Sequence, residues 1–285
     1  MTIKRRERDT VVEGLIQCKS CHTEFPIIRG IPRFVSSDAY VRSFSAEWTI
    51  FSRTQLDFDE NRETFVTKTG LLPDKLAGSV VLEAGCGMGR FLDVVSREPK
   101  ATVVGFDLSL AVESAYANFG SRPNVHIVQA DVMQPPFSQN SFDAVYSIGV
   151  LHHTSDPEAA FGNLVPLLRR GGKIAIWVYS KPRLPALSDF YRIFTSRMPW
   201  SFDLAFSSVL VKTYRLHALS PYVQLILPIS SLPDPEQRLL DTFDWYSPRF
   251  QFKYRALEII AWFRRLGLKD VRVLSFPVSV SGVKR

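Results

Sequence analysis

Three glycines and a carboxylate near residue 85, together with a second carboxylate at Asp107, make up the part of the chain best suited to binding a small ligand. Gly85, Gly87 and Gly89 alternate along the chain, directly after the acidic residue Glu83. Bare backbone lets a ligand approach closely, and a carboxylate beside it favours a positively charged ligand over a pyrophosphate. Asp107 follows about 20 residues later, where a carboxylate can accept hydrogen bonds from both hydroxyls of a ribose.

The segments on either side of these residues have the patterns of a strand, a helix and a second strand. Residues 80–82 form a short apolar run that predicts a buried parallel strand, and residues 90–97 have helical spacing of apolar side chains. A second apolar run at 102–106 ends at Asp107. Taken alone, this pattern is also compatible with a tight strand-to-helix turn that binds nothing.

The sequence Glu83-Ala-Gly-Cys-Gly-Met-Gly89 resembles motif I of the class I S-adenosylmethionine-dependent methyltransferases, E/D-x-G-x-G-x-G, at each defined position. Further landmarks follow in the family's order. Asp131 comes after a predicted strand at 125–130, and residues 141–148 predict a fourth strand. A helix is expected from Asp156 to Leu168, ended by the sequence RRGG, before a fifth strand at 173–179. The resemblance covers residues 76–180.

The resemblance implies an α/β, Rossmann-like sheet of seven strands in the order 3-2-1-4-5-7-6, the last strand antiparallel, with helices on both faces and a helical lid insertion. It also implies S-adenosylmethionine as the cofactor and S-adenosylhomocysteine as the product, with Asp131 at the adenine amino group. The cofactor-binding residues expected on this basis are Glu83, Gly85, Cys86, Gly87, Gly89, Asp107, Leu108, Asp131, Val132, Ile148 and Gly149.

Two adjacent histidines after the fourth strand are the candidate catalytic residues. His152 and His153 lie where the transferring methyl group is expected, and histidine titrates near neutral pH. We expect one of them, His153 rather than His152, to orient or deprotonate an acceptor hydroxyl. The alternative is that both rings merely form a wall of the cofactor pocket. The family's D/N-P-P-F/Y signature is absent here, which disfavours methylation of DNA adenine or of glutamine.

Residues 181–240 are expected to form the inserted lid, because seven prolines break residues 182–235 into short apolar pieces. We expect the lid to cover a hydrophobic acceptor, to rest on a membrane surface, or simply to pack on the core. The aromatic residues expected on its underside are Phe190, Tyr191, Phe194, Trp200, Phe202 and Phe206. The acceptor contacts expected from other segments are Trp48, Tyr179, and, from a predicted loop at 241–250, Asp241, Trp245 and Tyr246.

The N-terminal residues indicate two smaller units before the methyltransferase-like domain at 71–285. Residues 1–37 resemble the second half of a zinc-ribbon module, with Cys18-x-x-Cys21 but no second cysteine pair. We therefore expect a ribbon remnant, a small hairpin packed on the catalytic domain, that binds no metal within one copy. Sharing of one zinc ion across a dimer stays open, and so does the oligomeric state. Residues 38–70 are expected to form a helical cap.

Composition limits the cellular setting and the partners. The chain has 46% apolar and 22% charged residues, enough for a folded core. No run of about 18 apolar residues is present, and three cysteines give no disulfide framework, which favours a cytoplasmic protein. The net charge of +7 fits RNA, an anionic membrane or an anionic substrate, or else a basic solvated surface.

Three functions are compatible with these patterns. The first is a small-molecule methyltransferase that acts on oxygen or carbon of a hydrophobic or glycosylated acceptor. The second is a tRNA or rRNA methyltransferase. The net charge and the ribbon remnant favour this function, whereas the lack of an RNA-binding motif disfavours it. The third is a cofactor-binding scaffold without catalysis. We expect no DNA partner.

Overall fold

The computed structural model describes residues 2–7, 10–35, 45, 47, 50–182, 187–214, 224, 226 and 228–285. Trp48, an expected acceptor contact, and most of the expected helical cap before residue 50 lie outside the described residues.

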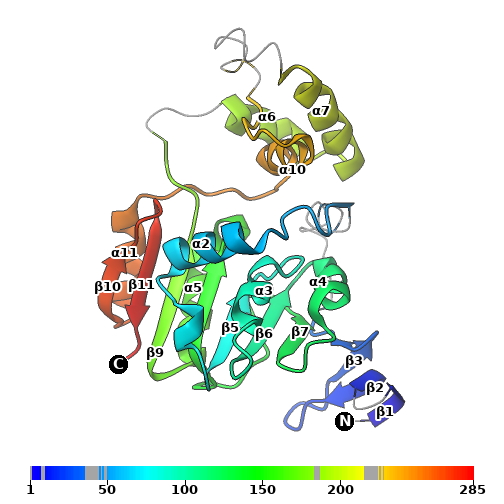
Figure 1. Ribbon diagram of the computed structural model, residues 1–285, viewed down its shortest axis with the longest axis vertical. Helices are drawn as coiled ribbons and strands as arrows, with labels where there is room; N and C mark the ends of the chain where they lie inside the picture. The colour runs from blue at the N-terminus through cyan, green and yellow to red at the C-terminus, as the bar shows by residue number, and fades with distance from the viewer. Residues whose placement is uncertain are drawn as a thin grey trace.

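A seven-stranded sheet forms the centre of the molecule (Figure 1). Its strands are β5 (Val80–Ala84), β6 (Thr102–Asp107), β7 (Val125–Gln129), β8 (Phe142–Ile148), β9 (Leu168–Trp177), β10 (Lys269–Val273) and β11 (Ser279–Val283). They lie in the order β10-β11-β9-β8-β5-β6-β7, and β11 alone runs antiparallel to β9 and β10. Numbered from β5, this is 3-2-1-4-5-7-6, which confirms the predicted topology.

Helices cover both faces of the sheet because its central strands are apolar on both sides. Val81 and Leu82 of β5 are both fully buried, and they point into two different core clusters. One face packs against α2 (Phe58–Thr69), α3 (Arg90–Ser96) and α4 (Ala111–Phe119). The other face packs against α5 (Pro157–Leu164) and α11 (Ala256–Arg265).

The expected helix from Asp156 to Leu168 ends earlier than predicted. Asp156 caps it as expected, accepting the Ala159 N–H at 3.0 Å, but α5 stops at Leu164 and a single 3-10 turn follows. Pro166 has no N–H and its ring clashes with the preceding helical turn, so the helix cannot continue through it. The sequence RRGG therefore lies inside β9 and does not cap a helix.

In the described part of the chain between β9 and α11, three helices stand over the carboxyl ends of the parallel strands (Figure 1). They are α6 (Leu187–Thr195), α7 (Trp200–Lys212) and α10 (Pro235–Tyr246). The loop predicted at 241–250 is wrong, because α10 includes Asp241 and Tyr246. The helix starts at Asp234, whose carboxylate accepts the Gln237 N–H at 2.8 Å, followed by Pro235 in the first turn.

The aromatic residues of α6 and α7 do not form the apolar underside that the sequence suggested. Tyr191 and Phe206 pack against the fully buried Tyr246 of α10. The other four point to solvent with 40–57% of their surface exposed: Phe190, Phe194, Trp200 and Phe202. Contact of this surface with a membrane stays a prediction.

A second, four-stranded sheet forms the N-terminal unit, in the order β1 (Thr2–Glu7), β2 (Thr10–Gln17), β3 (Glu24–Ile28), β4 (Ile31–Pro32). Cys18 and Cys21 follow β2 as free thiols, and the Cys21 thiol donates to the Thr23 hydroxyl at 3.2 Å. No group of three or more metal-binding side chains occurs among the residues that the structure describes. Within the same residues, no helix is long and apolar enough to cross a bilayer.

Arg33 fastens the N-terminal sheet to the central domain. Its guanidinium donates to the Gln129 side chain at 2.9 Å and to Glu113 at 2.7 Å, and its side chain is only 7% exposed. Arg29 contacts the same Glu113 at 2.8 Å, but from a position that is 75% exposed.

This pair of arginines gives a matched test of how the two sheets are joined. We expect Arg33→Met to lower the free energy of unfolding by about 1.5–3 kcal/mol, because it removes buried hydrogen bonds from a charged group. Arg29→Met should cost less than about 1 kcal/mol, since water screens an exposed ion pair. Urea titration of both variants checks this, and equal losses would contradict it.

Candidate cofactor and acceptor site

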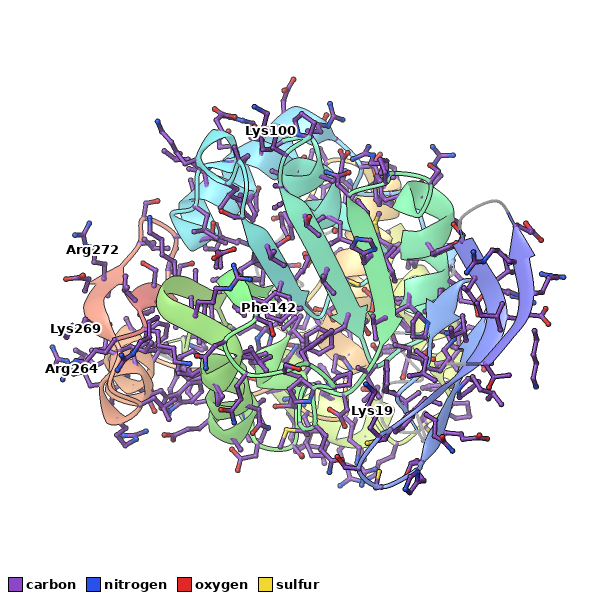
Figure 2. All side chains as sticks on the ribbon, turned by 90° about the horizontal axis from the view of Figure 1, so that it is seen from below. Lys19, Lys100, Phe142, Arg264, Lys269 and Arg272 are labelled. Carbon is purple, nitrogen blue, oxygen red and sulfur yellow. The ribbon has the colours of Figure 1, made fainter. Side chains whose placement is uncertain are left out.

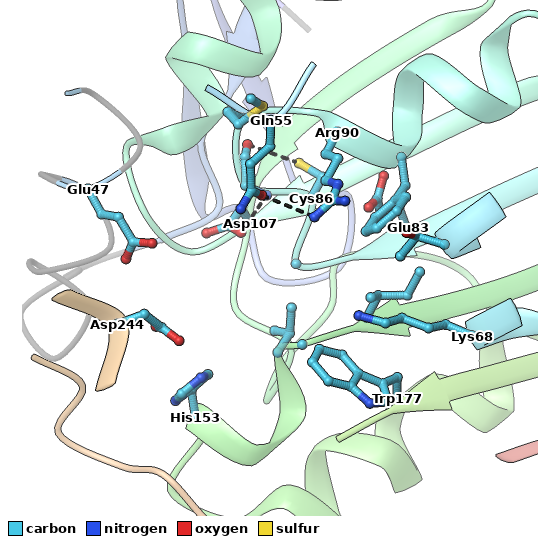
Figure 3. A pocket seen from close by; sticks show the side chains of 18 of the residues that line it. Glu47, Gln55, Lys68, Glu83, Cys86, Arg90, Asp107, His153, Trp177 and Asp244 are labelled. Carbon is cyan, nitrogen blue, oxygen red and sulfur yellow. Dashed lines mark hydrogen bonds between the residues drawn. The ribbon is translucent and has the colours of Figure 1, made fainter. Parts of the chain in front are cut away.

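A cavity of about 660 Å³ opens at the carboxyl ends of β5, β6, β8 and β9 (Figure 3). Helices α2 and α10 contribute further walls. Ten of the eleven expected cofactor residues line it: Glu83, Gly85, Cys86, Gly87, Asp107, Leu108, Asp131, Val132, Ile148 and Gly149. Open α/β sheets bind their ligands at this end of the strands.

Glycine is required at two positions of the turn after β5. Gly85 and Gly89 have φ angles of +81° and +95°, in the left-handed region. A Cβ atom at Gly85 would lie 2.3 Å from the Val150 side chain, and one at Gly89 would lie 2.6 Å from Phe119. Gly89 is the expected residue outside the lining, and it instead starts α3. The glycines of the turn therefore expose backbone to the cavity, and Cys86 and Met88 line it beside them.

Asp107 ties this turn to the end of β6. One of its carboxylate oxygens accepts the Gly87 N–H at 2.9 Å, and the other accepts the Ser109 N–H and hydroxyl at 2.8 and 2.7 Å. Burial raises the pKa of Asp107, and these hydrogen bonds oppose the rise. The hydrogen bonds hold this carboxylate in place at the edge of the cavity, which Asp107 lines.

Glu83 places a second carboxylate deep in the cavity wall. It is 2% exposed and accepts the hydroxyl of the buried Tyr146 at 3.0 Å. Burial raises the pKa of Glu83 well above its usual range. A bound cation would stabilise its charged form, which fits the ammonium group of an amino acid.

The adenine position expected at Asp131 also lies in this cavity. Asp131 accepts the Met133 N–H at 2.9 Å, which fixes the carboxylate at the end of β7, and Val132 lies next to it in the lining.

Two basic side chains, Arg90 and Lys68, lie on the side of the cavity where Glu83 lies (Figure 3), and the sequence patterns did not single them out. Arg90 donates to Asn61 and to Gln55, at 2.5 and 3.2 Å. The Lys68 ammonium lies 3.4 Å from the centre of the Trp177 ring, and burial lowers its pKa to about 7. The position of Arg90, directly after motif I, was a signal for it, whereas Lys68 reaches the cavity only through the packing of α2.

Of the two histidines, only His153 lines the cavity. Its Nδ1 lies 2.8 Å from the Phe250 carbonyl oxygen, and because a carbonyl only accepts, Nδ1 carries the proton. Nε2 is then the basic nitrogen. Burial lowers the pKa of His153, and the nearby Asp244 carboxylate opposes this. The ring is thus neutral and oriented at neutral pH.

His152 is fully buried and stacks between its neighbours. Its ring centre lies 4.1 Å from that of His153 and 4.0 Å from that of Tyr179. Neither ring nitrogen has a hydrogen-bond partner among the described residues. Burial lowers the pKa of His152 well below its usual range, so it acts as an uncharged packing residue.

Of the expected acceptor contacts, some line the cavity and others do not. Tyr179 lines the cavity and donates its hydroxyl to Asp244 at 2.5 Å, and Asp241 also lines it. Tyr246 and Trp245 do not line it, because they belong to the side of α10 that packs against α6 and α7. Tyr246 donates its hydroxyl to the Pro228 carbonyl at 2.6 Å.

The side of α10 that faces the cavity is mainly polar. Its residues lie at helical spacing and line the cavity: Gln237, Leu240, Asp241 and Asp244. Glu47 joins the two aspartates from a different part of the chain, and Figure 3 shows its carboxylate directed toward Asp244. Trp177 and Phe276 form an aromatic wall on the opposite side.

The residues of this cavity fit S-adenosylmethionine as a ligand. The exposed turn, with Asp107 and Asp131, suits a nucleoside. Glu83 suits an ammonium group, and Arg90 and Lys68 suit a carboxylate. The cavity volume of about 660 Å³ leaves the site in the range of small-ligand pockets, which is about 300–1,000 Å³.

Known proteins with related sequences or folds agree with this arrangement. Residues 82–176 match the methyltransferase domain family. An O-methyltransferase of Aspergillus sclerotiorum is 29% identical over 140 residues, which are 46% of this chain and 53% of that protein. A tRNA (carboxymethyluridine(34)-5-O)-methyltransferase of Xenopus tropicalis is 32% identical over 127 residues, 43% of this chain and 19% of that protein. The matched segments thus span between about a fifth and about half of these relatives.

A solved structure shows the same fold. The phosphoethanolamine N-methyltransferase 2 of Haemonchus contortus, in complex with S-adenosyl-L-methionine, superposes with a TM-score of 0.50 at 18% sequence identity. The match covers 88% of this chain and 47% of that one. Together with motif I, the sheet order and the match of residues 82–176, this shows that the chain carries a class I S-adenosylmethionine-dependent methyltransferase domain.

Proposed function

We propose that this protein transfers the methyl group of S-adenosylmethionine to an oxygen or carbon atom of a small metabolite. The observation that carries the proposal is the position of His153. An oriented, neutral imidazole lies in the wall of the same cavity that contains the motif I turn. Cofactor and acceptor would share this cavity, so the acceptor is small. Trp177 and Phe276 also line the cavity, with the Lys68 ammonium over both rings, and the rest of their surface supports an acceptor that is partly apolar.

The cofactor supplies an electrophilic methyl group on a sulfonium. In the bound complex the acceptor oxygen or carbon would bond to this methyl carbon as the sulfur–carbon bond breaks, which would leave a neutral thioether. Nε2 of His153 accepts the proton from the acceptor, while its Nδ1 donates a hydrogen bond to the Phe250 carbonyl oxygen. Helix α10 forms a wall of the cavity above the strand ends.

Methylation of RNA is the alternative, and the distribution of positive charge does not favour it. Basic residues are spread over separate elements (Figure 2), with Lys19 in the N-terminal sheet, Lys100 before β6, and Arg264, Lys269 and Arg272 around α11 and β10. The cavity itself is rich in carboxylates, which repel a phosphate backbone.

The choice between these acceptors can be tested with a labelled methyl group. The protein is incubated with S-adenosylmethionine labelled in its methyl group, together with a small-molecule extract or total RNA from cells that naturally make it. We expect label in the small-molecule fraction. Label only in RNA would overturn the proposal, and no label in either would favour a non-catalytic scaffold.

Cofactor binding should depend on Asp107. We expect Asp107→Ala to weaken the binding of S-adenosylhomocysteine by about 100-fold, because hydrogen bonds to a charged group are each worth about 1.5–3 kcal/mol. Calorimetric titration measures this, and native mass spectrometry of the purified protein should show the cofactor mass in the wild type only. Asp74→Ala, which removes an exposed carboxylate, is the control and should leave binding unchanged.

The two histidines should respond differently to the same replacement. His153→Phe should lower turnover by about 100- to 10,000-fold with unchanged S-adenosylhomocysteine binding, because the proton acceptor is lost. His152→Phe should keep both turnover and stability, since its ring nitrogens make no hydrogen bond among the described residues. Equal turnover in both variants would contradict a base role for His153.

The pH dependence of wild-type turnover should follow the protonation of His153. The lowered pKa keeps its ring neutral, and so able to accept a proton, at neutral pH. Turnover should therefore stay level above pH 7 and fall on acidification below the ordinary histidine pKa of about 6.5. A turnover that rises steadily above pH 7 would point to another base.

A further inference from the structure

Three carboxylates gather at the end of the cavity away from Glu83. Asp241 and Asp244 come from the cavity side of α10, and Glu47 comes from the segment before α2. Figure 3 shows Glu47 and Asp244 on one side of the cavity, and Glu83, Lys68 and Arg90 on the other. The two cations that line the cavity are therefore at the opposite end from this acidic group.

The three carboxylates are not equally satisfied by the protein. Asp244 accepts the Tyr179 hydroxyl, and Asp241 accepts hydrogen bonds from the Ser230 and Trp245 side chains. Glu47 is only 2% exposed, and its Oε2 has no hydrogen-bond partner among the described residues. An unpartnered carboxylate oxygen that is buried beside two other carboxylates is costly in the protein alone.

The crowding of these carboxylates makes the charged forms of Glu47 and Asp241 less favourable. Burial and the neighbouring charges of Asp244, Asp241 and, least of all, Asp107 raise the pKa of Glu47 well above its usual range. Burial also raises the pKa of Asp241, and so does Asp244. A bound cation would offset both the cost of burying these carboxylates and their mutual repulsion. The three carboxylates are therefore better stabilised with a cation bound than in the protein alone.

Neither a metal ion nor the cofactor accounts for this need. No group of three or more metal-binding side chains with suitable geometry occurs among the described residues, although these three carboxylates are within them. The groups that suit the ribose, adenine and ammonium of the cofactor are Asp107, Asp131 and Glu83, which come from the sheet. The remaining occupant of the cavity is the methyl acceptor.

We propose that the methyl acceptor carries a basic nitrogen, and that Glu47, Asp241 and Asp244 bind this nitrogen as its protonated, cationic form. The inference rests on the proposed function and specifies its substrate class as a small molecule with an aliphatic amine, such as an amino sugar. Trp177 and Phe276 contact the rest of the acceptor, and His153 receives the proton from the oxygen or carbon that is methylated.

His153 and Asp244 lie near each other but have different roles toward the acceptor. Asp244 binds the cationic nitrogen, and His153 removes the proton from the atom that is methylated. The Asp244 carboxylate raises the pKa of His153 while burial lowers it, so the two side chains interact across the cavity. The hydroxyl of Tyr179 holds Asp244 at 2.5 Å, which fixes the carboxylate that is nearest to the base. The cationic nitrogen thus binds next to the atom that loses its proton.

The first test is the charge of the labelled product. The wild-type protein methylates the small-molecule extract with labelled cofactor. The labelled products are first separated from unreacted S-adenosylmethionine, which is itself a cation, by liquid chromatography with mass detection, and are then passed over a cation exchanger at pH 7. We expect the label to be retained. A labelled product that passes unretained would overturn this inference while leaving the proposed methyltransferase intact, and the absence of label in all fractions would instead contradict the proposed function.

The second test uses neutral replacements of similar shape. Glu47→Gln and Asp241→Asn should each lower the labelling of the retained products by at least tenfold, with unchanged binding of S-adenosylhomocysteine. Glu236→Gln, an exposed position on the same helix, is the matched control and should label at the wild-type level. Loss of S-adenosylhomocysteine binding in Glu47→Gln would assign Glu47 to the cofactor and overturn the inference.

A stability measurement separates a ligand-binding role from a structural one. Because the buried Oε2 of Glu47 has no hydrogen-bond partner among the described residues, Glu47→Gln should raise the melting temperature of the ligand-free protein by about 2–4 °C. A structural carboxylate would give the opposite result, a lowered melting temperature together with lost activity. That outcome would overturn the inference even if labelling fell as expected.

Discussion

The hydrogen bond from the Gly87 N–H to the Asp107 carboxylate is the interaction on which the rest of the site depends. It joins the turn after β5 to the end of β6, two strands that pair in register along their whole length. The turn must be left-handed at Gly85, where the side chain of Val150 leaves no room for a Cβ atom. The exposed backbone and the fixed carboxylate therefore arise together, from one close contact between neighbouring strand ends.

The cavity has a division of charge that follows from its two sources of side chains. The sheet and the helices packed on it supply the motif I turn, Glu83 and two cations, a set that suits an amino acid joined to a nucleoside. Helix α10 and Glu47 supply carboxylates that the described protein leaves incompletely partnered. Because the second group comes from outside the sheet, it can differ between proteins that share the same cofactor site, and it is the natural place for acceptor specificity.

Two segments show how local signals can be outweighed or overlooked. The expected helix from Asp156 to Leu168 extends through Pro166, and the missing N–H of that residue ends it early. The loop predicted at 241–250 overlooks Asp234-Pro235, the same capping pattern that correctly starts α5 at Asp156-Pro157. With α10 in place, helical spacing alone would have put Asp241 and Asp244 on one face and Tyr246 on another.

The sequence by itself determined the strand, glycine turn and second strand around motif I, because apolar runs and alternating glycines are local signals. The order of the sheet strands, and ten of the eleven expected residues that line the cofactor end of the cavity, were predicted through the resemblance of motif I and the later landmarks to the methyltransferase family. Only the tertiary structure decided which histidine faces the cavity, and which surface of α10 covers it. It also placed Lys68 at one end of the cavity and Glu47 and Asp244 at the other, because long-range packing, not local pattern, sets where these side chains lie.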